Sequence, residues 1–301
     1  MTPSQAPPPN LRFRIYATAR SGVQAARRLV PAALVPPRRN LSASLAIGVT
    51  TYSPRYERFL RPLHAAILRI FPEVPLTVAV NGHGSAAEQA RYLERFQREI
   101  CVGSPAHHRF LLHDRPHGLT TLWNGMLAAS PNDRPLLILN DDLRLHAWMR
   151  RWAEGFDWAS VQLALLNSSW SHFAIAPATL QRVGAFDPGF PGIGFEDMDY
   201  TARAGLAGVA IGNHLCGYLR HHDDKPATTS FDAISARVWG KYTSANQEHF
   251  AASWEPCQEG EGIWIKQLHG WVRPRRPLER LPLRAIPASA WQGTVLFADR
   301  I

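Results

Sequence analysis

An acidic triplet, Asn140-Asp141-Asp142, follows directly after an apolar run and could bind a divalent metal ion. Residues 136–139 have the length and composition of a buried strand, so the triplet would stand where that strand ends. Two carboxylates and an amide offer the hard oxygen ligands that Mg²⁺ or Mn²⁺ prefers. Such an ion stabilises the charge that builds on a diphosphate leaving group. A polar turn would use the same residue types, because Asn and Asp favour turns for local reasons.

A second acidic cluster, Glu196, Asp197 and Asp199, stands at the start of a stretch with helical periodicity. The helix macrodipole favours negative charge there, so helix capping would account for Glu196 or Asp199. Capping does not account for the preceding glycine-rich segment 189–194, which could lie close to a ligand. A carboxylate at this position could accept a proton from an acceptor hydroxyl group.

A histidine pair, His221 and His222, precedes Asp223 and Asp224. Neutral imidazole beside carboxylates could complete a metal site. A solvated polar loop would have the same composition, and this segment alone does not separate the two interpretations.

Apolar runs alternate with amphipathic stretches in the first half of the chain, and this alternation predicts an α/β fold. The predicted strands are residues 45–49, 76–80, 109–112 and 136–139, and the predicted helices are residues 57–70, 86–100 and 120–129. This order is typical of a doubly wound, mainly parallel sheet with both faces covered. Ligands bind beyond the carboxyl ends of the strands in such sheets, which is where the acidic triplet would stand.

The second half of the chain has a looser pattern. It predicts strands at residues 161–166, 172–176 and 209–211, and helices at residues 177–183, 196–207 and 232–250. The remaining C-terminal residues have no clear period.

Taken in this order, the three polar segments resemble those of the GT-A glycosyltransferases of family 2. Leu139-Asn140-Asp141-Asp142 is similar to the family's LNND or LNDD, a DxD-like triplet at the end of a strand. The family's stretch GxFDxxFxxxxEDxDxxxRxxxxG is similar to residues 184–208. Thr51-Tyr52-Ser53-Pro54-Arg55 is similar to the early turn TYNR, and residues 118–125 resemble the helix with an NxG core. The resemblance covers residues 44–224.

The resemblance implies a metal-dependent, inverting transfer of a sugar from a nucleotide-sugar to a hydroxyl group. Asp142 would bind Mn²⁺ or Mg²⁺. His222, in preference to His221, would be the late contact to the metal or the diphosphate. Asp197 would be the general base, and Glu196 beside it would contact the acceptor.

The nucleotide-sugar would lie against residues near the ends of several strands. The residues that the resemblance assigns to it are Thr50, Thr51, Tyr52, Asn81, Asn124, Asn140 and Asp141. The family commonly has an acid after the second strand that contacts the base, and here Asn81 stands in its place. Asn81 could hydrogen-bond a base, but the nucleotide is not fixed by the sequence.

The expected division of the chain is a basic, proline-rich N-terminal tail at residues 1–42, a GT-A catalytic domain at 43–228, and a helical, basic extension at 229–301. The formal net charge is +9, and no acidic residue precedes Glu57. Such charge attracts an anionic membrane surface or an acidic glycan, and it serves solubility equally well. Nucleic-acid binding has only this charge to support it, because no recognition motif is present.

The composition favours a cytoplasmic enzyme. No stretch approaches the roughly 18 uncharged apolar residues that a membrane span needs. The 3 cysteines form no CxxC pair, which suits a reducing compartment. With the basic termini, these features predict a cytoplasmic protein that binds peripherally at the inner face of the membrane. A glycan or a lipid-linked molecule would then be the acceptor.

Two other classes of function remain open. Gly82-His83-Gly84-Ser85-Ala86-Ala87 fits GxGxxA after a strand, as in a Rossmann enzyme that binds NAD. The acid that should end the next strand is missing, because Asp114 lies too far along, and the glycines suit a turn. A non-catalytic GT-A-like domain could instead dock on a membrane or a polyanion through its arginines, although such a domain need not keep both Asp142 and Asp197.

Overall fold

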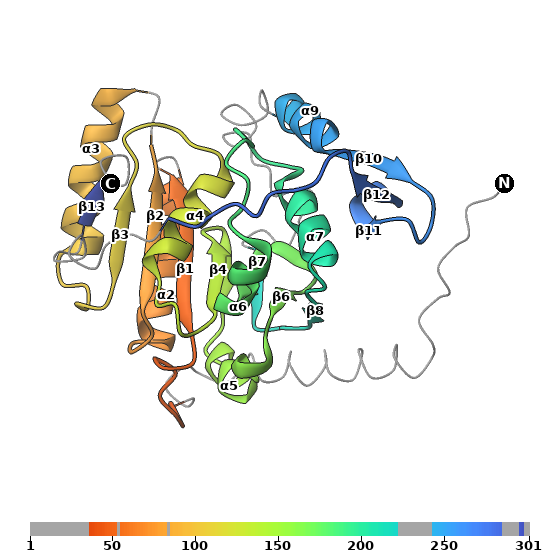
Figure 1. Ribbon diagram of the computed structural model, residues 1–301. Helices are drawn as coiled ribbons and strands as arrows, with labels where there is room; N and C mark the ends of the chain where they lie inside the picture. Colours follow the sequence, from red (N-terminus) through yellow and green to blue (C-terminus); the bar gives the residue numbers. More distant parts are fainter. Residues whose placement is uncertain (1–35, 53–54, 83–84, 222–242, 285–294, 298–301) are drawn as a thin grey trace.

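A mixed β-sheet forms the centre of the protein. The structure is a computed structural model that describes residues 36–52, 55–82, 85–221, 243–284 and 295–297. Within these ranges the main sheet has the strand order β13-β3-β2-β1-β4-β7-β6-β8 (Figure 1). Its strands are β1 (Ala46–Tyr52), β2 (Leu76–Asn81), β3 (Arg109–Leu112), β4 (Leu136–Asn140), β6 (Leu163–Leu166), β7 (Ser169–Ile175), β8 (Ile211–His214) and β13 (Val295–Phe297). Only the pairs that involve β7 are antiparallel, so the predicted α/β fold with a mainly parallel sheet is confirmed.

Helices cover both faces of this sheet. One face is packed by α2 (Arg61–Ile70), α3 (Ala86–Phe96) and α5 (Met149–Gly155), together with a small ladder of β5 (Leu143–Leu145) and β9 (Leu219–His221). The other face is packed by α4 (Leu119–Ala129), α6 (Pro177–Val183) and α7 (Glu196–Leu206). The predicted doubly wound arrangement is therefore present.

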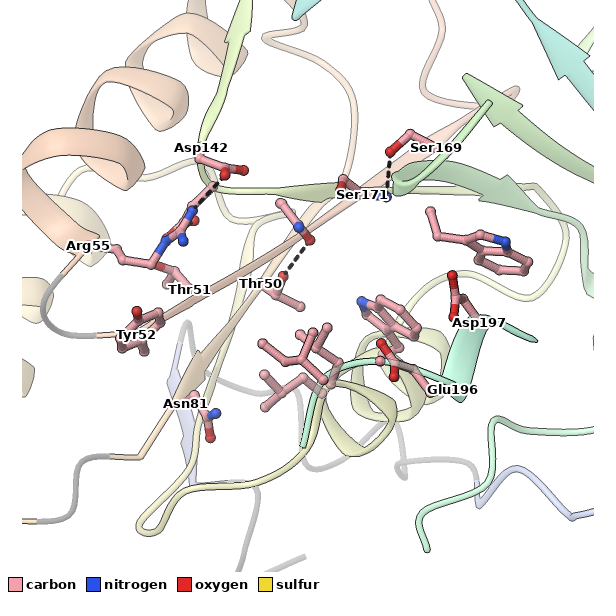
Figure 2. Close-up of a pocket in the computed structure, with 18 of the residues that line it drawn as sticks. Thr50, Thr51, Tyr52, Arg55, Asn81, Asp142, Ser169, Ser171, Glu196 and Asp197 are labelled. Atoms are coloured by element: carbon pink, nitrogen blue, oxygen red, sulfur yellow. Dashed lines mark hydrogen bonds and ion pairs between the residues drawn. The ribbon is translucent and has the colours of Figure 1, made fainter. Parts of the chain in front are cut away.

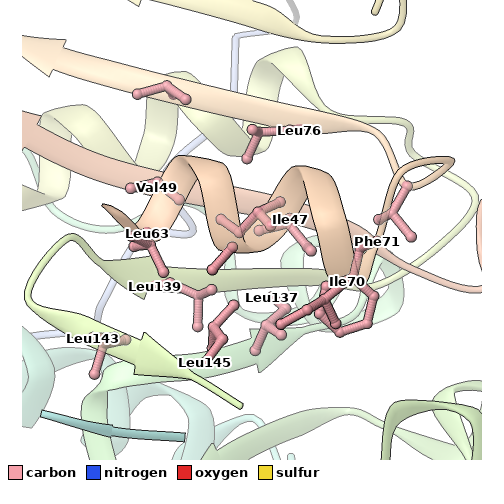
Figure 3. Packing of buried hydrophobic residues seen from close by; sticks show 14 of the residues in the cluster. Ile47, Val49, Leu63, Ile70, Phe71, Leu76, Leu137, Leu139, Leu143 and Leu145 are labelled. Carbon is pink, nitrogen blue, oxygen red and sulfur yellow. The ribbon is translucent and has the colours of Figure 1, made fainter. Parts of the chain in front are cut away.

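The central strands β1, β2 and β4 are mostly apolar up to their carboxyl ends because both of their faces are buried. Ile47 and Val49 of β1, with Leu137 and Leu139 of β4, point toward the α2 side, where Leu63 packs against the same cluster (Figure 3). The residues between them point toward α4. Full burial of one such side chain contributes about 1.5–3 kcal/mol, so this core fixes the register of the strands that end at the acidic triplet.

A smaller unit lies beside α7. It consists of α9 (Thr243–Ser253), the antiparallel strands β10 (Trp254–Cys257), β12 (Gly270–Pro274) and β11 (Ile263–Ile265), and a 3₁₀ turn, η8 (Lys266–Leu268) (Figure 1). Phe190, Phe250, Trp254, Ile265 and Val272 form its buried core. The sequence indicated a helix in this region but no strand, because each of these strands is short and only its inward side is apolar.

Several predicted boundaries differ from the structure. The helices predicted at 57–70 and 86–100 each contain one π-turn, Tyr56–Leu60 and Gln97–Cys101. The strand predicted at 209–211 is wrong in position, since β8 spans Ile211–His214. The helix predicted at 232–250 corresponds to α9 from Thr243 onward, and its earlier part lies outside the described residues. In the described ranges, none of the helices combines the length and the apolar character that crossing a membrane requires.

Candidate active site

A cavity of about 580 Å³ opens at the carboxyl ends of β1, β2 and β4. Ligand pockets commonly have volumes of about 300–1,000 Å³. The start of β7 lies at the same edge because β7 runs antiparallel, and the N-terminus of α7 forms the opposite wall. Figure 2 shows Thr50, Tyr52 and Asn81 on one side of this space and Glu196 and Asp197 on the other. The fold therefore brings the two predicted acidic clusters to a common cavity.

The aspartates of the triplet are held by Arg55, which lies directly after the first strand. Arg55 Nε is 2.7 Å from Asp141 Oδ1, and its Nη2 is 3.1 Å from Asp142 Oδ2. Thr51 Oγ1 donates a hydrogen bond of 2.6 Å to Asp141 Oδ2. The Arg55 guanidinium packs on the ring of Phe59 at 4.6 Å, so its orientation is fixed by stacking as well as by charge.

The two carboxyl groups differ in how they are used. Burial raises the pKa of Asp141 to about 6, although Arg55 opposes that shift. Burial would also raise the pKa of Asp142, but His221 and Arg55 outweigh it and hold that pKa below its ordinary value. Asp142 is therefore an anion at neutral pH. Both carboxyl oxygens of Asp141 already accept hydrogen bonds, one from Thr51 and one from Arg55.

One oxygen of Asp142 remains available to a metal ion. Asp142 Oδ1 is buried and accepts no hydrogen bond from the part of the chain that the structure describes. His221 Nδ1 lies 3.7 Å from this oxygen, and both ring nitrogens of His221 are buried without a hydrogen-bond partner among those residues. A carboxylate and an imidazole suit Mn²⁺, which takes its other ligands from water and phosphate. The described residues contain no group of three or more metal-ligating side chains, and His222 lies outside them.

A sharp turn aims the second acidic cluster into the cavity. Gly194 has φ +101° and Phe195 has φ +71°, so both lie in the left-handed region immediately before α7. This conformation costs a non-glycine residue of order 1–3 kcal/mol, and such strain is often found at functional sites. Glu196 and Asp197 line the cavity as a result. Asp199 points away from it, into the core, where it accepts hydrogen bonds from Arg203 and from Trp254.

The carboxyl groups of Glu196 and Asp197 differ in what they contact, and these contacts affect their pKa values. Glu196 is 4% exposed, and its Oε2 has no hydrogen-bond partner among the described residues. Burial, reinforced by the neighbouring charge of Asp197, raises the pKa of Glu196 to about 8. Burial also raises the pKa of Asp197, while the Met198 N–H and the Gln267 amide donate to its carboxylate and oppose that shift. The charge of Asp197 raises the pKa of Glu196, so Asp197 loses its proton before Glu196 does, which is the order that a general base beside a neutral acid requires.

Contacts from the C-terminal part of the chain hold the glycine-rich loop in place. The Asn246 side chain is fully buried, accepts a 3.0 Å hydrogen bond from the Gly192 N–H, and donates one of 2.6 Å to the Gly194 carbonyl. His249 Nε2 lies 2.9 Å from Asp187 Oδ2 at the start of the same loop. No local sequence pattern indicates these partners, because they are more than fifty residues away along the chain.

The predicted nucleotide-binding residues do not all face the cavity. Thr50, Thr51, Tyr52, Asn81, Asn140 and Asp141 line it. Asn81 Oδ1 already accepts hydrogen bonds from the N–H groups of Gly82 and His117, and its Nδ2 donates to the His117 carbonyl. One N–H of Asn81 therefore remains for a base.

Asn124 is not among the residues that line the cavity. Its Nδ2 donates to the Phe186 carbonyl at 2.8 Å, and its Oδ1 accepts from the Phe186 N–H at 2.9 Å. This amide bridges α4 to the loop before α7, so the structure does not support the predicted contact with a nucleotide-sugar.

Gly82, the first glycine of the GxGxxA pattern, fits tightly against the backbone of Arg115. A Cβ at this position would lie 2.3 Å from the carbonyl carbon of Arg115, so this glycine has a structural reason to be at the turn.

Sequence reasoning missed several residues that line the cavity. They are Arg55, Leu119, Leu122, Trp123, Ser168, Ser169, Trp170, Ser171, Lys266, Gln267 and His269. Ile193 and Gly194 also line the cavity, and they belong to the glycine-rich segment that was predicted to lie close to a ligand. Arg55 carried a usable signal, since it ends the segment that resembles TYNR. The residues of 266–269 carried none, because they follow a strand that the sequence did not indicate.

Comparisons with known proteins give fold-level likeness at low identity. No protein-family model and no curated protein sequence matches the chain. Among solved structures, S. aureus TarS is 13% identical with a TM-score of 0.42, over 56% of this chain and 35% of that one. GalNAc-T7 with UDP, GalNAc and Mn²⁺ is 11% identical with a TM-score of 0.44, over 82% and 59%. Glucosyl-3-phosphoglycerate synthase from Mycobacterium tuberculosis, with Mn²⁺, UDP-glucose and phosphoglyceric acid, is 17% identical with a TM-score of 0.40, over 79% and 90%.

The matched region spans less than two thirds of the first two of these chains. At these values of identity and TM-score, the likeness assigns no activity to this protein, and the cavity itself has to indicate the function.

Proposed function

We propose that this protein is a glycosyltransferase of the GT-A kind, which moves a sugar from a nucleotide-sugar to a hydroxyl group. The observation that carries this proposal is a single cavity lined by a carboxyl group at each end, in two different environments. Asp142 stands at the strand-end side and Asp197 at the opposite wall. A leaving diphosphate and an attacking hydroxyl need groups of these two kinds on opposite sides of the transferred sugar.

The nucleotide would occupy the strand-end side. Thr50, Thr51 and Tyr52 end β1 there, and Asn81 ends β2. The Thr50 hydroxyl donates to Asn140 Oδ1 at 3.4 Å, which keeps the amide of the triplet turned toward β1. In this arrangement, ribose and base contact the ends of β1 and β2, and the diphosphate lies near the triplet.

Mn²⁺ or Mg²⁺ would be held by Asp142 and one of the two histidines. The sequence favours His222, which lies outside the described residues, and His221 lies 3.7 Å from Asp142 Oδ1. Bound there, the ion would supply positive charge to the leaving diphosphate. Arg55 orients Asp142 by pairing with its other oxygen. Because Arg55 also pairs with Asp141, the triplet can lie beside a diphosphate with much of its own negative charge already neutralised.

Asp197 would act as the general base. It takes the proton of the acceptor hydroxyl while the acceptor oxygen forms a bond to the anomeric carbon. The bond from that carbon to the diphosphate oxygen breaks on the opposite face, so the configuration inverts. Glu196 remains protonated beside it and can donate a hydrogen bond to the acceptor or the sugar.

The acceptor in this proposal is a glycan or a lipid-linked molecule, used in the synthesis of cell-surface glycans or glycolipids. The net charge of +9 supports contact with an anionic membrane surface from the cytoplasmic side. Co-sedimentation with anionic and with neutral vesicles tests this part separately, and equal binding to both would contradict it.

Thermal shift with UDP, GDP, CDP, ADP and NAD, each with and without Mn²⁺, tests the transferase proposal. We expect metal-dependent stabilisation by one nucleoside diphosphate, lost in Asp142→Ala and retained in Asp157→Ala, since Asp157 is an exposed aspartate that does not line this cavity. Stabilisation by NAD without metal, or no stabilisation by any nucleotide, would contradict the proposal.

A further inference from the structure

The turn after β11 forms the part of the cavity wall next to the proposed base. Lys266, Gln267 and His269 line the cavity together with Asp197. Gln267 Nε2 donates to Asp197 Oδ2 at 3.3 Å, so the turn and the carboxylate are in direct contact. A molecule whose hydroxyl group reaches Asp197 would therefore also lie against residues 266–269.

The position of this turn is set by the core of the small unit. Ile265, just before the turn, is fully buried in the cluster that contains Phe190 and Trp254. Trp254 Nε1 donates a 2.9 Å hydrogen bond to Asp199 Oδ1 and so joins the small sheet to α7. His269 closes the turn with φ +48°, and its N–H bonds to the Lys266 carbonyl at 3.2 Å. The turn is thus fixed relative to the helix that carries Asp197.

The charge of Lys266 has no counter-ion within the described parts of the chain. No carboxylate of those residues forms an ion pair with it, although the neighbouring cations of the small sheet are paired, as Arg273 and Arg275 are with Glu255. Arg55, the other cation that lines the cavity, is held by Asp141 and Asp142. Among the residues that the structure describes, Lys266 is therefore the cation at the cavity wall whose charge is left for a bound molecule.

We propose that residues 266–269 recognise the acceptor and that the acceptor is an anion. Its carboxylate or phosphate group accepts hydrogen bonds from Lys266 Nζ and from the His269 ring, while a hydroxyl group of the same molecule reaches Asp197. The adjacent Glu196 adds no repulsion, because it is protonated. This inference rests on the proposed transferase function and adds the chemical class of its acceptor.

The test is isothermal titration of the full chain with glucose, glucuronate and glucose 6-phosphate at constant ionic strength. These sugars differ in charge but share the ring. We expect at least one of the anionic sugars to bind about tenfold more tightly than glucose, as one charge-assisted contact would give. Lys266→Gln should abolish that preference. Arg276→Gln should keep it, since Arg276 is an exposed cation on the same segment that does not line the cavity.

A preference for neither anion, or a preference that survives Lys266→Gln, would overturn the inference. The same variants are titrated with UDP, GDP, CDP and ADP in Mn²⁺. An equal loss of diphosphate affinity in Lys266→Gln would place Lys266 at the donor and would also overturn it. Failure of the transferase proposal looks different, because the wild-type chain would then bind none of these nucleotides, whatever the sugars do.

Discussion

Asn246 offers a test of how the C-terminal part of the chain supports the cavity. Its buried amide joins the Gly192 N–H and the Gly194 carbonyl, just before the acidic cluster. Asn246→Ala removes both hydrogen bonds and leaves a buried N–H unpaired. The lost hydrogen bond to the Gly194 carbonyl costs about 0.5–1.5 kcal/mol and the unpaired Gly192 N–H about 1–3 kcal/mol, which predicts a destabilisation of about 1.5–4.5 kcal/mol.

Urea unfolding followed by circular dichroism measures this free energy. Gln247→Ala is the matched control, because Gln247 lies on the same helix and faces solvent, and we expect its free energy of unfolding to change by less than about 0.5 kcal/mol. Asn246→Asp should keep the hydrogen bond from the Gly192 N–H but place a carboxyl oxygen against the Gly194 carbonyl oxygen, so it should also lower the free energy of unfolding. An Asn246→Ala variant as stable as Gln247→Ala would show that these two hydrogen bonds do not stabilise the fold.

Further predictions concern buried charge and pH. Asp199→Ala leaves the Arg203 guanidinium buried without its counter-ion, so urea unfolding should show a loss of about 3–5 kcal/mol, and a loss under 1 kcal/mol would contradict the pairing. Burial lowers the pKa of His64 and of His108 to about 4. Below pH 6.5, the ordinary pKa of histidine being about 6.5, these two side chains bind protons in the unfolded chain but not in the folded chain. The free energy of unfolding should therefore be full above pH 6.5 and fall toward pH 4, by up to about 1.4 kcal/mol per pH unit for each histidine. His108→Leu should flatten that fall relative to the exposed control His107→Asn, and identical pH profiles would contradict this account.

The sequence was sufficient to predict the parallel strands β1, β2, β3 and β4 and one end of the cavity, but it gave no indication of β13 at the edge of the main sheet. Runs such as residues 136–139 are apolar throughout because both faces of β4 are buried, and this signal is local. The position of the acidic triplet at a strand end follows from the same signal. The chain also carries a clue to the second cluster, since a glycine-rich segment precedes it and ends in Gly194, which adopts φ +101°.

What the sequence could not supply depends on contacts between distant segments. The three carboxylates of the second cluster look alike in sequence, yet Asp199 faces the core because Trp254 lies beneath it, fifty-five residues further along. Asn124 resembles a ligand-binding residue but bridges helix α4 to the loop before α7. The small sheet of β10, β11 and β12 buries its apolar residues against distant parts of the chain, and its short strands have no long periodic pattern that would have indicated it.

Asp197 as the general base of sugar transfer is tested by the release of nucleoside diphosphate from a panel of nucleotide-sugars, compared between the wild-type chain and Asp197→Asn. We expect the wild-type chain to release the diphosphate from one donor class. We expect a loss of about 100-fold or more in Asp197→Asn, the size of a general-base contribution, with the affinity for the diphosphate unchanged. Equal rates in both proteins, or no release from any donor, would contradict a transferase in which Asp197 is the base.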